Sequence, residues 1–199
     1  EEANMAIDQG QEVAFVYDNR ETELALIDPS QPDVDHVVVV PESILREAAE
    51  SGEMISHPDL PVDVKVVDYL KNSLPATQAQ SANPATAGVG VQLAMEDARA
   101  ATGVDTKQVI DFPSAYVELF DKDLKKSLGV YLVSTWGEDW LRMRALGPFL
   151  GQVRSALGQQ TVDVDGKQFD LALRFKRTYK DYSVTLKEFK NDYYAGTNI

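Results

Sequence analysis

The chain has 199 residues but no cysteine, only two histidines and no long hydrophobic run. Without cysteine it cannot form disulfides, thiolate nucleophiles, zinc fingers, iron–sulfur clusters or covalent haem attachments. Its longest apolar stretches, such as residues 37–40, are far shorter than the roughly 20 residues that span a bilayer. We therefore expect the chain as given to be a soluble piece of protein.

Basic residues are scarce as well, with 19 Lys and Arg against 32 Asp and Glu, for a net charge of −13. So acidic a surface repels phosphate groups, which argues against nucleic acids and anionic membranes as partners. A basic protein is the complementary possibility. Hydrophobic residues make up 44% of the chain, which excludes a disordered chain and is enough for the core of one ordinary domain.

Apolar residues alternate with period two along much of the chain. This predicts a mainly β fold, an antiparallel β-sandwich or barrel-like domain of about nine or ten strands with two or three short helices. Near the N-terminus, Val13, Phe15 and Tyr17 predict a strand, residues 18–21 a turn, and residues 23–28 the returning strand.

The strongest local signal is Asp165-Gly166, which lies between two alternating runs. It predicts a hairpin over residues 162–175 with a primed turn. The β-branched run at residues 36–40 predicts a strand that is buried on both faces. Helices are predicted at residues 41–50 and from Pro148 onward.

Residues 72–88 are mostly small and polar and include two prolines, which predicts an exposed loop. They would form the linker if the chain had two lobes, but neither side has a strand set that closes by itself. We therefore expect a single domain over residues 1–199. Alternation also predicts strands at residues 89–95 and 109–112.

His57, between Ser56 and Pro58, is the candidate ligand for haem or a metal ion. The alternative is an ordinary surface or capping histidine. The only other histidine, His36, is distant in sequence, and the two lack the spacing of a metal motif.

Acidic motifs have ordinary explanations. The motif Asp163-x-Asp165-Gly166 is similar to the opening of a calcium loop. However, Ala172 stands where such a loop requires a bidentate Glu, and a turn accounts for the motif. In a chain with 32 acidic residues, paired carboxylates such as Asp33-x-Asp35 and Glu96-Asp97 are expected by chance.

Two further clusters each have two interpretations. Trp136, Trp140 and Tyr131 either form an aromatic binding platform or pack in and around the core. A basic cluster is either the solvated face of a two-layer β structure or a contact to acidic headgroups or a haem propionate. It comprises Arg174, Lys176, Arg177 and Lys180.

Residues 182–189 read YSVTLKEF and lead to Tyr193-Tyr194-Ala195-Gly196-Thr197. Together with residues 164–167 and 171–177, this stretch resembles the ResB family of cytochrome c biogenesis proteins. In that family a strand of the form y-s-l-x-L-x-D/E-F precedes x-x-x-Y-x-G-T. A looser similarity covers Ile55-Ser56-His57-Pro58, Leu60-Pro61 and residues 64–69.

The resemblance implies an inner-membrane component of the System II apparatus, with a large extracytoplasmic (periplasmic) domain between transmembrane helices that lie outside this sequence. With a ResC-like membrane partner, such proteins move haem outward and join it to the Cys-x-x-Cys-His motif of apocytochrome c. Their haem-handling histidines are associated mainly with the membrane helices and the partner. For this chain the resemblance implies a binding or scaffold domain with no catalytic residues and no cofactor of its own. Its net negative charge would attract a lysine-rich apocytochrome.

The sequence has no Met start and ends abruptly at Ile199, so we expect a fragment of a longer protein. The rival function is that of an extracellular β-sandwich enzyme or carbohydrate-binding module. It would place two carboxylates in an aromatic cleft near Trp136 and Trp140. A purely structural spacer is a third possibility.

Overall fold

The computed structural model describes residues 5–32, 34–76, 83–100, 110–123, 125–138, 148–158 and 160–190. It is 53% strand, in antiparallel sheets with two short helices, so the predicted mainly β, sandwich-like fold is confirmed. The strands are β1 (Glu12–Asp28), β2 (His36–Pro41), β3 (Met54–Ile55), β4 (Val62–Leu70), β5 (Ser73–Ala76), β6 (Ala94–Asp97), β7 (Ser114–Asp121), β8 (Ser127–Ser134), β9 (Gln160–Val164) and β10 (Lys167–Thr185). The helices are α1 (Glu42–Ser51) and α2 (Pro148–Leu157), with the short 3-10 turns η1 (Gly88–Val91) and η2 (Thr135–Gly137).

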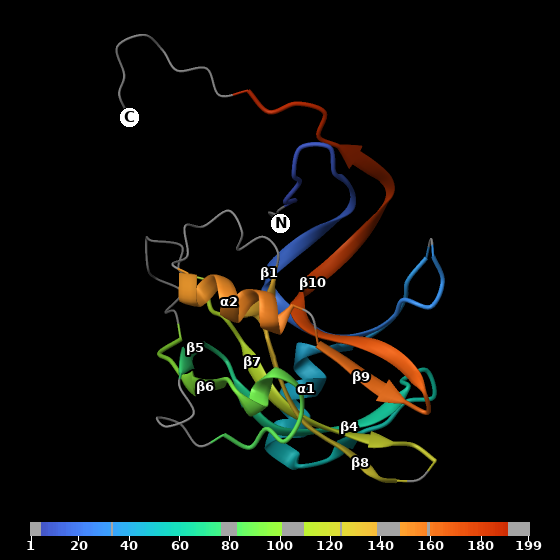
Figure 1. Ribbon diagram of the computed structural model, residues 1–199, viewed down its shortest axis with the longest axis vertical. Helices are drawn as coiled ribbons and strands as arrows, with labels where there is room; N and C mark the ends of the chain where they lie inside the picture. The colour runs from blue at the N-terminus through green and yellow to red at the C-terminus, as the bar shows by residue number, and fades with distance from the viewer. Residues whose placement is uncertain are drawn as a thin grey trace.

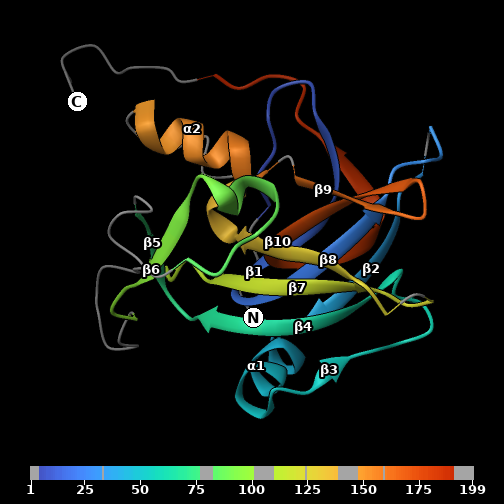
Figure 2. The same ribbon diagram turned by 60° about the horizontal axis from the view of Figure 1, so that its bottom comes forward.

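Two four-stranded sheets pack against each other (Figures 1 and 2). The first has the strand order β2-β1-β10-β9 and the second β3-β4-β7-β8, while β5 pairs with β6. Because side chains alternate along a strand, every second residue points into the space between the sheets. On β4 these are Val62, Val64 and Val66, each at most 3% exposed. Leu24 and Leu26 of β1 belong to the same buried cluster from the opposite sheet.

Helix α1 packs against β4, as Figure 2 shows, and its Leu45 and Ala48 lie in the core. The helix ends at Gly52, whose φ of 73° lies in the left-handed region that favours glycine. The Gly52 amide donates to the carbonyl of Ala48 at 2.9 Å. The helix predicted at residues 41–50 is confirmed.

A second buried cluster covers the other side of the β7–β8 pair, beneath α2. Helix α2 begins at Pro148, as predicted. No helix in the described ranges has the length and apolar character needed to cross a bilayer. The cluster comprises Leu93, Met95, Tyr116, Leu132, Trp136, Val153 and Leu157.

The predicted β9–β10 hairpin is also confirmed. The two strands pair antiparallel, with Val164 opposite Lys167. Asp165 and Gly166 have φ values of 54° and 79°, as a primed two-residue turn requires.

Two predictions about the N-terminal strands are wrong. Residues 18–21 do not reverse the chain: β1 continues through them, and its register with β10 shifts between Asp18 and Thr22, where residues 19–21 bulge out. Strand β2 pairs only with β1 at the edge of its sheet, and Val39 is 40% exposed. Alternation and β-branching identify a strand, but they do not give its place in a sheet.

The loop predicted at residues 72–88 is partly a strand. Ser73 and Ala76 of β5 are buried, and the Ser73 hydroxyl lies 2.6 Å from that of Ser114. The packing of these small side chains against β7 overrides their polar composition. Residues 77–82 lie outside the described residues.

Two shorter strand predictions are wrong, the first only in part. Residues 88–91 form the η1 turn, and β6 begins only at Ala94. Residues 110–112 belong to no strand, and residue 109 lies outside the described ranges.

Candidate binding surface

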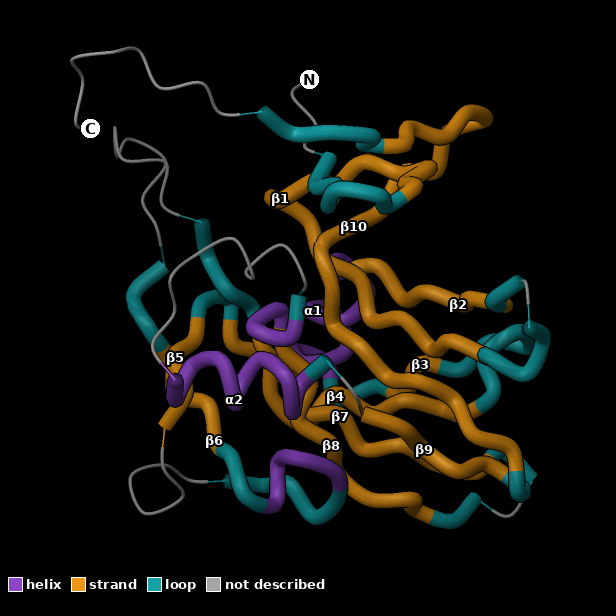
Figure 3. Tube along the Cα trace, turned by 45° about the horizontal axis from the view of Figure 1, so that its top comes forward, coloured by secondary structure: helices purple, strands orange, loops and turns teal. Residues whose placement is uncertain are grey.

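The longest strand pair leaves the sandwich as a two-stranded arm (Figures 1 and 3). Strands β1 and β10 pair from the body out to Glu12 opposite Thr185. However, β2 pairs with β1 only from Glu23 onward, and β9 pairs with β10 only as far as Leu171. Farther out, in the residues that the structure describes, the two strands have only each other as sheet neighbours.

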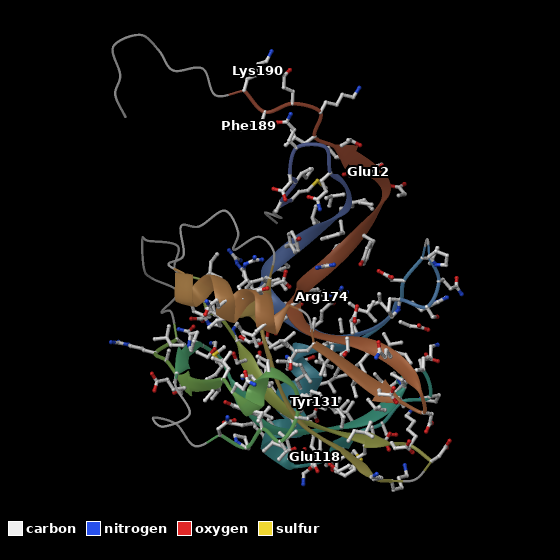
Figure 4. All side chains as sticks on the ribbon, viewed as in Figure 1. Glu12, Glu118, Tyr131, Arg174, Phe189 and Lys190 are labelled. Carbon is white, nitrogen blue, oxygen red and sulfur yellow. The ribbon has the colours of Figure 1, made fainter. Side chains whose placement is uncertain are left out.

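We define the arm as residues 5–22 and 176–190. At its distal end, the Gly10 amide donates to the Leu186 carbonyl at 2.7 Å, and the Leu186 amide donates to the Gln11 carbonyl at 3.2 Å. The segments just beyond the outer ends of β1 and β10 are therefore joined at the tip of the arm. Figure 4 shows Glu12, Phe189 and Lys190 at this end of the arm.

A hydrogen-bonded threonine fixes the bulge at the base of the arm. The amide of Thr22 donates to Oε2 of Glu42 at 3.0 Å, and its hydroxyl lies 3.2 Å from the same oxygen. The Thr22 hydroxyl also lies 3.3 Å from the hydroxyl of Tyr69. Burial raises the pKa of Tyr69 far above its usual range, so this phenol stays neutral. The bulge is thereby anchored to α1 and β4.

A buried ion pair lies next to the bulge. Nε of Arg174 donates to Oε1 of Glu23 at 2.8 Å, and the two residues are 3% and 6% exposed. Figure 4 places Arg174 where the arm meets the body. On the opposite side of β10, the Phe175 amide donates to Oε1 of Glu138 at 3.0 Å. Both strands are therefore held by charged side chains where the arm begins.

Aromatic side chains stiffen the arm itself. The Phe15 ring lies 5.2 Å from that of Tyr17 and 5.5 Å from that of Tyr179. The guanidinium of Arg177 stacks over Phe15 at 4.5 Å and reaches Tyr17 at 5.8 Å. An isolated two-stranded ribbon is marginal in water, and such contacts each contribute about 0.5–1.5 kcal/mol.

The arm differs from the body in formal charge, and it carries exposed apolar side chains, as parts of the body also do. It contains six Lys and Arg and six Asp and Glu, so its formal net charge is zero and the chain's −13 lies elsewhere. Four large hydrophobic side chains of the arm are exposed, namely Tyr179 (59%), Tyr182 (58%), Val184 (40%) and Phe189 (71%). Exposed apolar side chains that gather on one projecting element are typical of an interaction site.

The basic cluster is divided between the body and the arm. Arg174 is buried in its ion pair, so the solvated-face interpretation is wrong for this residue. It holds for the exposed Lys180 and for Lys176, whose Nζ lies 2.7 Å from the exposed Glu21. The sequence could not reveal the Glu23–Arg174 pair, because 151 positions separate its members.

His57 lies in the exposed loop between β3 and β4. Its side chain is 63% exposed, and Nδ1 is 3.6 Å from Oδ2 of Asp59 and accepts from the Asp59 amide at 3.3 Å. These contacts fit a histidine that caps its own turn. Within the described ranges, no group of three or more His, Asp or Glu is placed to hold a metal ion.

The two described members of the aromatic cluster are core residues. Tyr131 is 8% exposed between the two sheets, whereas Trp136 is 7% exposed in the cluster beneath α2. Nε1 of Trp136 donates to the Ser73 carbonyl at 3.0 Å, and its ring lies 4.6 Å from that of Phe112. The two rings therefore form no common platform. Trp140 lies outside the described residues.

Asp163 and Asp165 belong to a tight turn. Oδ1 of Asp163 accepts from the Gly166 amide at 3.0 Å. The negative charge of Asp121, from the neighbouring hairpin, raises the pKa of Asp165. The turn accounts for this motif, as the sequence suggested.

The remaining paired carboxylates lie apart from these features. Glu96 and Asp97 are exposed at the end of β6, and Asp35 is exposed just before β2. Asp33 lies outside the described residues.

The structure is thus an antiparallel β-sandwich with a projecting two-stranded arm that carries exposed apolar side chains. Comparison with known family models and with curated proteins finds no match to this chain.

Proposed function

We propose that this chain is the extracytoplasmic binding and scaffold domain of a ResB-like inner-membrane protein. It would act with a ResC-like partner in cytochrome c maturation and receive apocytochrome c on the periplasmic side. The proposal begins with the sequence resemblance at residues 164–177 and 182–197. The observation that carries it further is the separation of charge, with a net charge of −13 outside the neutral arm.

The α1 face is the best-suited receiving surface. Residues 42–59 contain five Asp and Glu but only one Arg. Ile44 and Met54 are 43% and 45% exposed among these charges. A lysine-rich chain would be attracted to this acidic surface over the roughly 8 Å screening length of physiological salt, and the two apolar side chains would add short-range contact.

The test is a titration of the purified chain with a lysine-rich apocytochrome peptide that contains a blocked Cys-x-x-Cys-His motif. We expect weak binding that falls by about tenfold or more between low and physiological salt, because attraction between surface charges is screened. Glu47→Gln with Glu50→Gln should weaken it, whereas the matched control Glu188→Gln on the arm should not. Absence of binding at low salt would favour the spacer interpretation.

Haem is titrated separately. The scaffold proposal expects absent or feeble haem binding, because two distant histidines offer no paired axial ligands at helical or strand spacing. Tight binding with a six-coordinate spectrum that disappears in His57→Ala would overturn the proposal and make the domain a haem-carrying station.

A further inference from the structure

We propose that the outer edge of β10 in the arm, residues 176–185, binds an extended acidic segment of a partner protein by strand addition. This edge is distinct from the α1 face, and the proposal holds whether or not the cytochrome assignment is correct.

The edge has backbone groups available for pairing. Strand β9 ends its pairing with β10 at Leu171, and Glu138 occupies the amide of Phe175. From Lys176 outward, no other described strand pairs with this side of β10. The whole of β10 lacks proline, so no backbone donor is missing from the edge.

An irregularity interrupts the pairing of β10 with β1. The register with β1 passes from Phe15 opposite Tyr179 directly to Val13 opposite Val184. Residues 180–183 therefore have no register partner on β1. This part of β10 is paired with β1 less regularly than the rest of the arm.

The exposed apolar side chains of the arm lie on the same strand and just beyond it. Tyr179, Tyr182 and Val184 belong to β10. By contrast, Val13 and Tyr17 of β1 are only 4% and 8% exposed. In strand addition, backbone hydrogen bonds supply affinity and alternate side chains supply specificity. Of the two described strands of the arm, β10 therefore combines a free edge with exposed apolar side chains, whereas the apolar Val13 and Tyr17 of β1 are buried.

The charge of this edge favours an acidic partner. Residues 176–190 contain five Lys and Arg against two Asp and Glu, whereas residues 12–22 contain three Asp and Glu against one Arg. Lysines on a sheet edge discourage pairing with the same edge of a second copy. A strand edge with free backbone groups calls for an extended polypeptide rather than a nucleic acid or a membrane surface. An extended protein segment that alternates acidic and apolar side chains is complementary in both respects.

The test uses the ¹⁵N-labelled chain and a short synthetic peptide that alternates Glu with Val and Thr. Two control peptides carry Lys in place of Glu, or the Glu sequence with alternate backbone nitrogens methylated. We expect the acidic peptide to shift the amide signals of residues 176–185, and both control peptides to leave them unchanged. Lys180→Glu should weaken binding at least tenfold, while Lys126→Glu, in the β7–β8 turn, should have no effect.

Several outcomes would overturn the proposal. Equal binding of the methylated peptide would mean charge attraction without strand addition. Shifts confined to the body, or no binding, would remove the arm as the site. Shifts of the arm with phosphatidylserine vesicles but not with the peptide would indicate a membrane surface, and concentration-dependent shifts without peptide would indicate a second copy. None of these results depends on the lysine-rich peptide that tests the proposed function.

Discussion

Arg174 and Glu23 lie directly opposite each other on β10 and β1 and form a buried ion pair, with Nε 2.8 Å from Oε1, where the arm leaves the body. Because both side chains are removed from water, each charge depends on the other. The pair thus fixes the two strands to each other beside the bulge in β1.

Breaking this pair should destabilise the protein strongly. Glu23→Gln or Arg174→Met should each lower the free energy of unfolding by about 3–5 kcal/mol, because each leaves an uncompensated buried charge or polar group. The double variant Glu23→Leu with Arg174→Leu should recover much of the loss. Urea unfolding measures all three variants, and single losses below about 1 kcal/mol would contradict a buried, mutually dependent pair.

The aromatic contacts of the arm predict a contrast between two substitutions. Phe15→Ala removes contacts to Tyr17, Tyr179 and Arg177 and should cost about 1–2 kcal/mol. Tyr182→Ala, at an exposed position on the same arm, should stay within about 0.5 kcal/mol. Hydrogen exchange of the arm amides measures the difference, and equal exchange in both variants would argue against an aromatic cluster that stiffens the arm.

One substitution in the β9–β10 turn should make the protein more stable. Asp165→Asn removes the repulsion from Asp121 that raises the pKa of Asp165. Asn accepts the positive φ of this position about as well as Asp. We expect a higher urea midpoint at pH 7 and a smaller gain in acid, where the native carboxyl is protonated. Asp165→Ala, which fits the turn poorly, should be less stable than Asp165→Asn, and the reverse order would contradict this explanation.

Asp28 should contribute to stability in a pH-dependent way. Hydrogen bonds from the Lys167 amine and from Ser30 lower the pKa of Asp28 from 3.8 to about 2. A carboxyl with a lowered pKa stabilises the folded state above its unfolded pKa and loses that effect as pH falls through the folded one. The contribution should be complete above about pH 4 and lost between about pH 4 and pH 2. Asp28→Asn and Lys167→Met should both reduce the dependence of the urea midpoint on pH across this range. An unchanged pH profile in both variants would exclude the ion pair as the cause of that dependence.

The sequence predicts the local elements better than their environment. Asp165-Gly166 specifies its turn through backbone geometry alone, so the hairpin follows from two residues. The edge position of β2 depends instead on which strands flank it, which no pattern within residues 36–40 records. The bulge at residues 19–21 reads as a turn because polar residues suit both. Only the pairing with β10 and the contact of Thr22 with Glu42 decide between them.

The candidate surface was less accessible to sequence reasoning. The basic cluster can be recognised in the sequence. Its division cannot, because Arg174 is buried by pairing with Glu23, far away in the sequence, while Lys176 and Lys180 stay exposed. The arm itself could not be predicted, because it results from the different lengths of β1 and β10 and of their neighbours. The alternating residues of the arm look like those of any half-buried strand.

One measurement tests the central claim that the chain has two binding surfaces of opposite charge preference. The ¹⁵N-labelled chain is titrated with the lysine-rich apocytochrome peptide and, in a second sample, with the acidic peptide. We expect the lysine-rich peptide to shift amides of residues 42–59, with a salt-sensitive affinity, and the acidic peptide to shift amides of residues 176–185. If both peptides shift the same residues, or if each shifts the surface assigned to the other, the chain does not have two surfaces with these opposite charge preferences.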